Sequence, residues 1–213
     1  MNCCTQRGLN QIFTTGMARA EIKDFRKKGL DKRDRLLAEL VAARGVQGAT
    51  VLEVGGGIGG IQIALLRAGA SHSVDVDISE GYVAGARELA GSLGYGAVSE
   101  QRVLDFAHAP DDVVPADVVI MNRVVCCYPD MPALVKPAAQ HAQRLLALTF
   151  PREAWWMHAG RQTINFGMRL LRKDFRFFVH SHEAIIALVT ANGLRPSIDR
   201  FSGVWRIMIF ERG

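Results

Sequence analysis

Short apolar runs alternate with longer segments of helical periodicity from residue 50 onward. The runs are rich in Val, Ile and Leu, which is typical of strands buried on both faces of a parallel sheet. We expect such strands over residues 50–54, 72–77, 97–104, 116–122 and 144–150. The periodicity between them predicts helices over 58–68, 79–93 and 131–143. Strands that alternate with helices indicate an α/β fold built on a parallel sheet.

The chain changes character after Pro151. A basic stretch of helical periodicity carries six aromatic residues, Trp155, Trp156, Phe166, Phe175, Phe177 and Phe178. We expect residues 151–180 to form a cap inserted into the main domain. The two tryptophans are expected in its core, or alternatively as an aromatic wall against a flat ligand. A capped helix is predicted over 181–192, and strands over 194–200 and 204–211 are predicted to close the sheet as a hairpin.

The N-terminal part of the chain is basic and amphipathic. We expect residues 14–44 to be helical, and we divide the chain into a helical lid, 1–45, and a main domain, 46–213. No apolar run approaches the roughly 18 residues that span a bilayer, and the first ten residues lack the pattern of a signal peptide. These features predict a cytoplasmic protein with no membrane span.

The charge is unevenly distributed along the chain. Lys and Arg number 26 and Asp and Glu 21, which gives +5, and such a basic balance by itself suggests a nucleic-acid partner. However, residues 1–45 carry 10 basic and 5 acidic residues, 46–150 carry 6 and 11, and 151–213 carry 10 and 5. No base-methylation motif or RNA-binding module is recognisable. We therefore expect a small-molecule partner, drawn in by two basic flanks around an acidic centre.

Four cysteines occur as two adjacent pairs, Cys3–Cys4 and Cys126–Cys127. This spacing matches neither a disulfide framework nor a structural zinc site, so we expect reduced thiols and no metal site. An alternative is that the two pairs together bind a soft metal or metalloid, if the N-terminus folds over the second pair.

The strongest local signal is a glycine-rich loop, Glu53-Val-Gly-Gly-Gly-Ile-Gly-Gly60, between a predicted strand and a predicted helix. Glycines permit a tight turn and let the backbone approach a ligand closely. Gly55, Gly57 and Gly60 fit the dinucleotide-binding fingerprint. Glu53, Gly55, Gly57 and Gly59 instead resemble the loop of class I S-adenosylmethionine-dependent methyltransferases.

Three features favour the methyltransferase alternative. An acid at Glu53 is typical of that loop, whereas the dinucleotide loop is usually apolar at this position. The predicted terminal hairpin resembles the last two strands of the methyltransferase sheet. A chain of 213 residues leaves little room for the separate substrate domain of most dehydrogenases. Asp77 suits either cofactor, since both present ribose hydroxyls.

The resemblance implies a Rossmann-like, seven-stranded, mostly parallel sheet with an antiparallel C-terminal hairpin, and S-adenosyl-L-methionine as the cofactor. By resemblance, Asp77 binds the ribose, Ile78 packs on the adenine, Asp105 accepts from the adenine amino group, and Asn122 and Arg123 line the methionine side. The full set of expected cofactor residues is Glu53, Gly55, Gly57, Gly59, Asp77, Ile78, Asp105, Phe106, Asn122 and Arg123.

Two further stretches resemble the magnesium-protoporphyrin O-methyltransferases and the small methyltransferases grouped with them. Arg123-Val-Val-Cys-Cys-Tyr-Pro129 is similar to the segment that follows the fourth strand in that group, with Cys127 in place of a histidine. Phe178-Val-His-Ser-His-Glu183 is similar to the approach to the last helix. This implies a small anionic or planar acceptor, methylated on a carboxylate or hydroxyl oxygen.

Candidate catalytic residues follow from the chemistry of methyl transfer. The acceptor must lie in line with the methyl group; a carboxylate needs no base, whereas a phenol or thiol benefits from one. Tyr128 and His180 are the candidate bases by position, although His180 could instead tie the cap to the last helix. The alternatives are a thiol or metalloid methyltransferase that uses the cysteine pairs, and a non-catalytic protein that binds S-adenosylmethionine.

Overall fold

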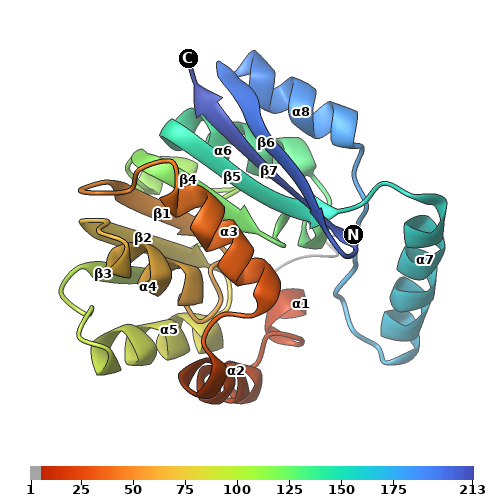
Figure 1. The fold of residues 1–213 in the computed structure, drawn as a ribbon. Coiled ribbons are helices and arrows are strands. Elements are labelled where there is room, and N and C mark those ends of the chain that lie inside the picture. The colour runs from red at the N-terminus through yellow and green to blue at the C-terminus, as the bar shows by residue number, and fades with distance from the viewer. Residues whose placement is uncertain (1–5) are drawn as a thin grey trace.

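The computed structural model describes residues 6–213, with side chains from residue 8 (Figure 1). A seven-stranded sheet has the order β3-β2-β1-β4-β5-β7-β6. The strands are β1 (Thr50–Val54), β2 (His72–Asp77), β3 (Ser99–Val103), β4 (Ala116–Asn122), β5 (Ala142–Pro151), β6 (Leu194–Ser202) and β7 (Trp205–Arg212). Strands β1 to β5 are parallel, and β7 runs antiparallel between β5 and β6. The predicted Rossmann-like fold with an antiparallel C-terminal hairpin is confirmed.

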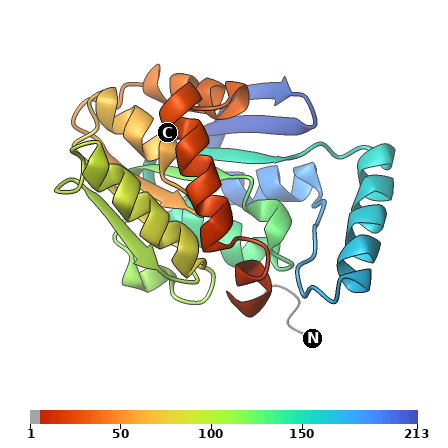
Figure 2. The same cartoon turned by 90° about the horizontal axis from the view of Figure 1, so that it is seen from below.

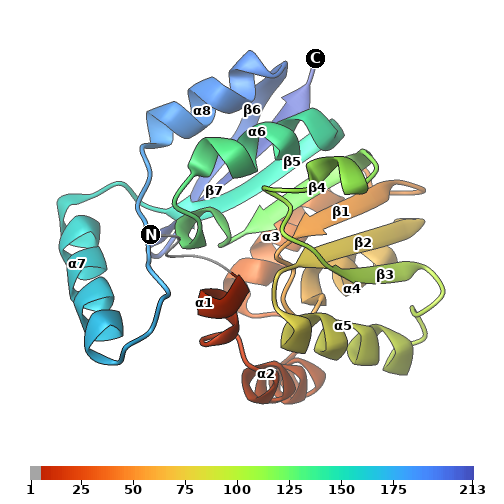
Figure 3. The ribbon, with the colours of Figure 1, turned by 180° about the vertical axis from the view of Figure 1, so that it is seen from behind.

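Helices cover both faces of the sheet (Figures 1 and 3). They are α1 (Gln6–Asn10), α2 (Thr15–Lys28), α3 (Lys32–Ala42), α4 (Gly60–Arg67), α5 (Glu80–Ser92), α6 (Met131–His141), α7 (Trp155–Leu170) and α8 (His182–Ala191), with short 3₁₀ turns over Pro110–Asp112 and Val125–Cys127. Val118 and Ile120 of β4 pack with α3 and α4, whereas Val119 and Met121 pack with α6 and α8. This alternation explains why the central strands are apolar at almost every position. None of the described helices is both long and apolar enough to cross a membrane.

The N-terminal segment 14–44 is helical, as its pattern predicts, and is divided into two helices at Gly29. Gly29 ends α2 with a positive φ of 71°, and its N–H donates to the Phe25 carbonyl at 2.8 Å. Asp31 then caps α3 by accepting from the backbone N–H groups of Arg33 and Asp34, at 2.9 and 2.8 Å. The break turns α3 back onto the sheet while α2 packs beside α5 (Figure 2).

The segment after β5 also differs from expectation. Trp155 and Trp156 are 82% and 40% exposed, and no residue of α7 is buried, so the expected tryptophan core is wrong. Helix α7 stands to one side of the sheet (Figures 1 and 2). The buried aromatic residue of this segment is Phe175, whose ring meets that of Phe13 edge-on at 6.1 Å.

Candidate active site

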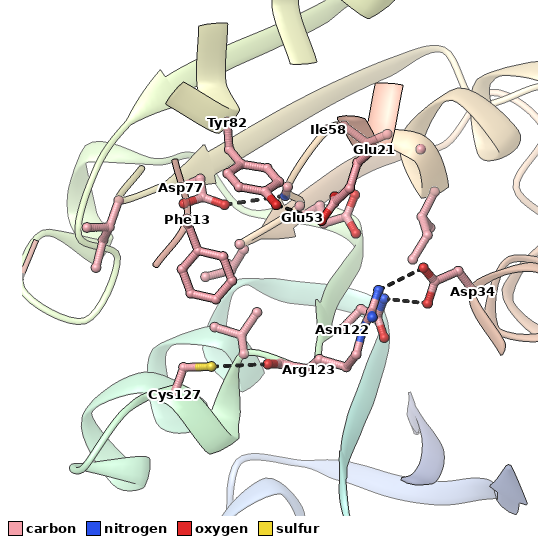
Figure 4. A pocket seen from close by; sticks show the side chains of 18 of the residues that line it. Phe13, Glu21, Asp34, Glu53, Ile58, Asp77, Tyr82, Asn122, Arg123 and Cys127 are labelled. Atoms are coloured by element: carbon pink, nitrogen blue, oxygen red, sulfur yellow. Dashed lines mark hydrogen bonds and ion pairs between the residues drawn. The ribbon is translucent and has the colours of Figure 1, made fainter. Parts of the chain in front are cut away.

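A cavity of about 660 Å³ opens at the carboxyl ends of β1, β2 and β4 (Figure 4). The sheet order reverses between β1 and β4, and ligands of open α/β sheets bind at such a switch point. The glycine loop, the strand ends and the N-terminal helices line this cavity together. Its volume lies within the roughly 300–1,000 Å³ of small-molecule sites.

The buried carboxylate of Asp75 supports the glycine loop. Gly55 and Gly57 adopt positive φ angles of 69° and 60°, which favour glycine. The Gly56 N–H donates to Asp75 Oδ1 at 3.0 Å, and a Cβ at Gly56 would lie 2.6 Å from that oxygen. Asp75 is fully buried, so it supports the loop and does not face solvent.

Asp77, at the end of β2, faces the loop across the cavity. Its carboxylate accepts from the Ser79 N–H at 2.8 Å and from the Gly57 N–H at 3.3 Å. Burial raises the pKa of Asp77 above its usual value despite these bonds. The pKa of Asp75 is raised further, by burial and then by the charges of Asp77 and Glu53. The cavity wall is thus an acidic cluster that a cationic ligand would stabilise.

Glu53 is the most unusual residue of this cluster. It lines the cavity but is only 1% exposed, and its Oε2 atom has no hydrogen-bond partner among the described residues. Burial, followed by the negative charge of Asp34, raises the pKa of Glu53 to about 8. The carboxyl group therefore holds a proton at neutral pH when no cation lies beside it.

The carboxylate of Asp34 joins the N-terminal helices to the end of β4. Asp34, in the first turn of α3, accepts from Asn122 Nδ2 at 2.9 Å and from an Arg123 guanidinium nitrogen at 2.8 Å (Figure 4). Asn122 Oδ1 is buried and has no hydrogen-bond partner among the described residues. Arg123 has a positive φ of 64°, rare for a residue with a side chain. We call the Asp34–Asn122–Arg123 contact the latch.

A second set of contacts joins the N-terminal segment to α5. Tyr82 donates its hydroxyl proton to Glu21 at 2.6 Å, and its ring meets that of Phe13 edge-on at 5.8 Å. Ser79 Oγ donates to the Phe13 carbonyl at 2.8 Å. Burial and the neighbouring Glu21 raise the pKa of Tyr82, so its hydroxyl remains a donor.

Tyr128 lines the cavity together with Cys127. The Tyr128 hydroxyl lies 3.1 Å from His108 Nδ1, and that nitrogen lies 2.8 Å from Asp105 Oδ2. His180 is missing from the described residues that line the cavity; its Nε2 lies 2.9 Å from the Tyr128 carbonyl, and burial lowers its pKa. His180 therefore sits behind Tyr128.

The two described cysteines, Cys126 and Cys127, are free thiols that line the cavity. Cys126 Sγ lies 3.2 Å from the Arg123 carbonyl and 3.9 Å from Cys127 Sγ. The hydrogen bond with Cys127, and then burial, raise the pKa of Cys126 well above its usual value. Cys3 and Cys4 lie outside the described residues. Within residues 6–213, no group of three or more His, Cys, Asp or Glu side chains could hold a metal ion.

The expected cofactor residues gather around this one cavity, with one exception. Lining residues are Glu53, Gly55, Gly57, Asp77, Ile78, Asp105, Phe106, Asn122 and Arg123. Gly59 does not line it; with a φ of 74°, it begins α4. Sequence reasoning missed Asp34, Glu21, Tyr82 and His108. Two of them left a sequence signal: Asp34 is an acid in the first turn of α3, and His108 follows Asp105 by three residues.

Comparison with known proteins agrees with this geometry. A family model described as a methyltransferase domain matches residues 24–196. Magnesium protoporphyrin IX methyltransferase (ChlM) from Synechocystis PCC 6803 with bound SAH is 26% identical, with a TM-score of 0.67, over 84% of this chain and 81% of that chain. The same enzyme with bound SAM has a TM-score of 0.65 over 84% of this chain and 77% of that chain.

A more distant structure shows the same fold. An O-methyltransferase family protein from Burkholderia thailandensis has a TM-score of 0.73 at 17% identity, over 92% of this chain and 58% of that chain. No curated protein matches the chain in sequence. With the family model covering most of the chain, and the loop, acidic cluster and sheet order in place, the chain belongs to the class I S-adenosylmethionine-dependent methyltransferases.

Proposed function

We propose that the cavity holds S-adenosylmethionine with its adenosine toward β2 and β3 and its methionine toward β1 and β4. Asp77 would accept from the ribose hydroxyls and Asp105 from the adenine amino group. Ile78 and Phe106 supply apolar surface for the adenine ring. Asn122 and Arg123 would bind the methionine end, where Asn122 Oδ1 offers a free acceptor to an ammonium group.

The observation that carries this proposal is the state of Glu53. A buried carboxyl group with an unpartnered oxygen faces the cavity and holds its proton at neutral pH. S-adenosylmethionine brings a sulfonium and an ammonium group, and either would favour the ionised carboxylate. A nicotinamide dinucleotide instead brings a negatively charged pyrophosphate to this loop, which would keep the Glu53 carboxyl group protonated and would not favour its ionised form.

Calorimetric titration with S-adenosylmethionine and with NAD tests the cofactor assignment. We expect binding of the first and none of the second, and Asp77→Ala should abolish the binding. Gly91→Ala is the matched control, because a Cβ at Gly91 meets nothing within 4 Å and this exposed residue lies in the last turn of α5. Binding of NAD alone would contradict the proposal.

For the acceptor, we infer a small planar molecule that presents a hydroxyl or carboxylate oxygen. Phe13, Tyr128 and Phe177 come from three separate segments and line the same cavity, which provides aromatic surface for a flat ring. The acceptor oxygen attacks the methyl carbon, the carbon–sulfur bond breaks, and S-adenosylhomocysteine leaves as a neutral thioether. Positioning the two reactants supplies much of the rate enhancement.

If the acceptor is a hydroxyl, we assign Tyr128 and His108 to its proton. The Tyr128 hydroxyl would orient the acceptor oxygen, and His108, largely exposed and 2.8 Å from Asp105, would pass the proton to solvent. His180 is then a positioning residue that holds the Tyr128 backbone. A carboxylate acceptor is ionised at neutral pH and needs no such proton transfer.

A panel of acceptors distinguishes the remaining alternatives. We expect methyl transfer to planar phenols or aromatic carboxylates, detected by mass spectrometry of the product. Magnesium protoporphyrin is one member of the panel, since the 26% identical ChlM is named for it. Turnover only with thiols or arsenite, lost in Cys127→Ser, would contradict O-methylation. Cofactor binding without turnover on any member would indicate a binding protein.

A further inference from the structure

Helix α7 presents an apolar face to solvent. Trp155, Phe166 and Leu170 are 82%, 64% and 69% exposed. At 100° per residue, their spacing of 11 and 15 positions from Trp155 places them within about 60° of one another on the helix. Trp156, about 100° from Trp155 around the helix, is also exposed and widens this face, whereas Ile164 is exposed on the other side of the helix. We call the Trp155–Phe166–Leu170 row the apolar stripe.

Contacts with the rest of the chain fix this outward orientation. Asn165, about 80° from Trp155 and about 140° from Leu170 around α7, donates through Nδ2 to the Phe177 carbonyl at 2.9 Å and accepts from the Phe177 N–H at 2.8 Å. The Phe178 N–H in turn donates to the Cys126 carbonyl at 2.8 Å. These contacts tie the Asn165 side of the helix to the body and leave the apolar stripe exposed. A surface helix of a globular protein normally turns its most apolar face toward the body.

The segment that contains the apolar stripe is basic. Residues 152–176 contain six basic side chains, Arg152, Arg161, Arg169, Arg172, Lys173 and Arg176, against the acids Glu153 and Asp174, a net charge of +4. Arg169, about 40° from Trp155 around the helix, and Arg172, just past the end of α7, are exposed. This combination of tryptophan, phenylalanine and leucine on one side with arginine alongside is typical of helices that lie in a membrane interface.

We propose that α7 binds the surface of a membrane that contains anionic lipids. The apolar stripe would enter the boundary between headgroups and acyl chains, and the arginines would pair with lipid phosphates. A second copy of the chain fits less well. A helix of 16 residues is about 24 Å long and about 10 Å wide. The area of one face of such a helix is far below the roughly 800 Å² that each partner contributes to a stable interface.

Co-sedimentation with vesicles tests this proposal on the full chain. We expect binding to vesicles of phosphatidylcholine mixed with phosphatidylglycerol, weak binding to phosphatidylcholine alone, and loss of binding at high salt. Two of the three tryptophans lie on α7, so vesicle addition should also shift the fluorescence maximum to shorter wavelength.

Variants assign the binding to α7. The triple variant Trp155→Ser/Phe166→Ser/Leu170→Ser should weaken vesicle binding by more than about tenfold, because three large apolar side chains no longer enter the interface. Arg169→Glu/Arg172→Glu should remove the preference for anionic lipid. The matched control is Val114→Ser, which removes a 73% exposed apolar side chain elsewhere and should bind as the unmodified chain does.

Two readouts keep the test decisive. All variants should retain their affinity for S-adenosylmethionine, since α7 does not line the cavity, and this shows that they fold. Equal vesicle binding by the triple variant would overturn the proposal. A second outcome would also overturn it. If the unmodified chain does not bind vesicles but forms a dimer in light scattering, and the triple variant is a monomer, then the partner of α7 is a second copy of the chain.

Discussion

At the scale of single residues, the protonation of Glu53 predicts a pH-dependent cofactor affinity. The free carboxyl group has a pKa of about 8, and a cationic cofactor lowers it, so binding below pH 8 releases a proton. Affinity for S-adenosylmethionine should therefore rise from about pH 6 to about pH 8 and level off above it. Calorimetry in buffers of different ionisation enthalpy counts the released proton.

Glu53→Gln provides the comparison for that measurement. The amide has nearly the same shape but cannot ionise, so its variant should bind more weakly and with no pH dependence over the same range. The variant should also gain stability relative to the unmodified chain at alkaline pH, because burying an ionised Glu53 without its ligand is costly. A pH-independent affinity in the unmodified chain would show that Glu53 does not respond to the cofactor.

Removal of the Tyr128 hydroxyl distinguishes a hydroxyl acceptor from a carboxylate acceptor. With a hydroxyl acceptor, Tyr128→Phe should lower kcat by about 10²-fold while leaving cofactor affinity unchanged, because the phenol acts in the transition state. His108→Ala should lower kcat as well. His158→Gln, on α7, is the control histidine. An unchanged kcat in Tyr128→Phe would point to a carboxylate acceptor that needs no proton transfer.

At the scale of elements, the latch predicts slow cofactor exchange. Asp34 is mostly buried, lines the cavity and joins α3 to the end of β4. Asp34→Asn removes the charge that holds Arg123, so the cofactor should dissociate about tenfold faster. Stopped-flow displacement measures this rate. Glu39→Gln, an exposed acid on the same helix, should leave the rate unchanged, and equal rates in all three proteins would exclude a gating role for α3.

Two Gly→Ala substitutions, one in the glycine loop and one in α5, should change the stability of the fold in opposite directions. Gly56→Ala places a Cβ 2.6 Å from Asp75 Oδ1 and should destabilise the fold by roughly 1–3 kcal/mol and abolish cofactor binding. Gly91→Ala, in α5, meets nothing within 4 Å and should stabilise the fold by about 0.5–1 kcal/mol. Denaturant titration measures both changes, and a stable Gly56→Ala that binds cofactor would show that the loop tolerates a side chain.

The hydrophobic pattern, together with the polar residues that end each run, predicted the strands in which apolar side chains are buried. Strands β2 and β4 occupy the predicted residues, since an apolar run ended by Asp77 or Asn122 has a clear boundary. The break at Gly29 was missed because α2 and α3 are both amphipathic on either side of it. Periodicity also groups the residues of α7 on one face, but it cannot tell whether that face turns toward the core.

The cofactor residues were predictable because they follow strand ends, which the parallel sheet brings to one edge. The latch was not, since Asp34 and Arg123 are 89 positions apart and their contact depends on how α3 packs. His108 was missed for a related reason: its contact with Tyr128 joins two loops 20 positions apart.

At the scale of the whole molecule, cofactor binding should stabilise the fold by mass action. Ligand at a hundred times its Kd adds about 2.7 kcal/mol, which for a domain of this size raises Tm by roughly 5–10 °C. Differential scanning calorimetry with S-adenosylmethionine measures this shift. NAD should give none, nor should S-adenosylmethionine with Asp77→Ala, and a shift in either control would indicate binding outside the proposed site.

The position of β7 in the sheet has a consequence for how the chain is made. Strand β5 pairs on one side with β4 and on the other with β7, which begins 54 residues after β5 ends. While the ribosome synthesises those residues, the apolar edge of Leu145–Phe150 has no partner strand, and unpaired apolar edges promote aggregation. Slower synthesis at low temperature, or more chaperone, should therefore raise the yield of folded protein.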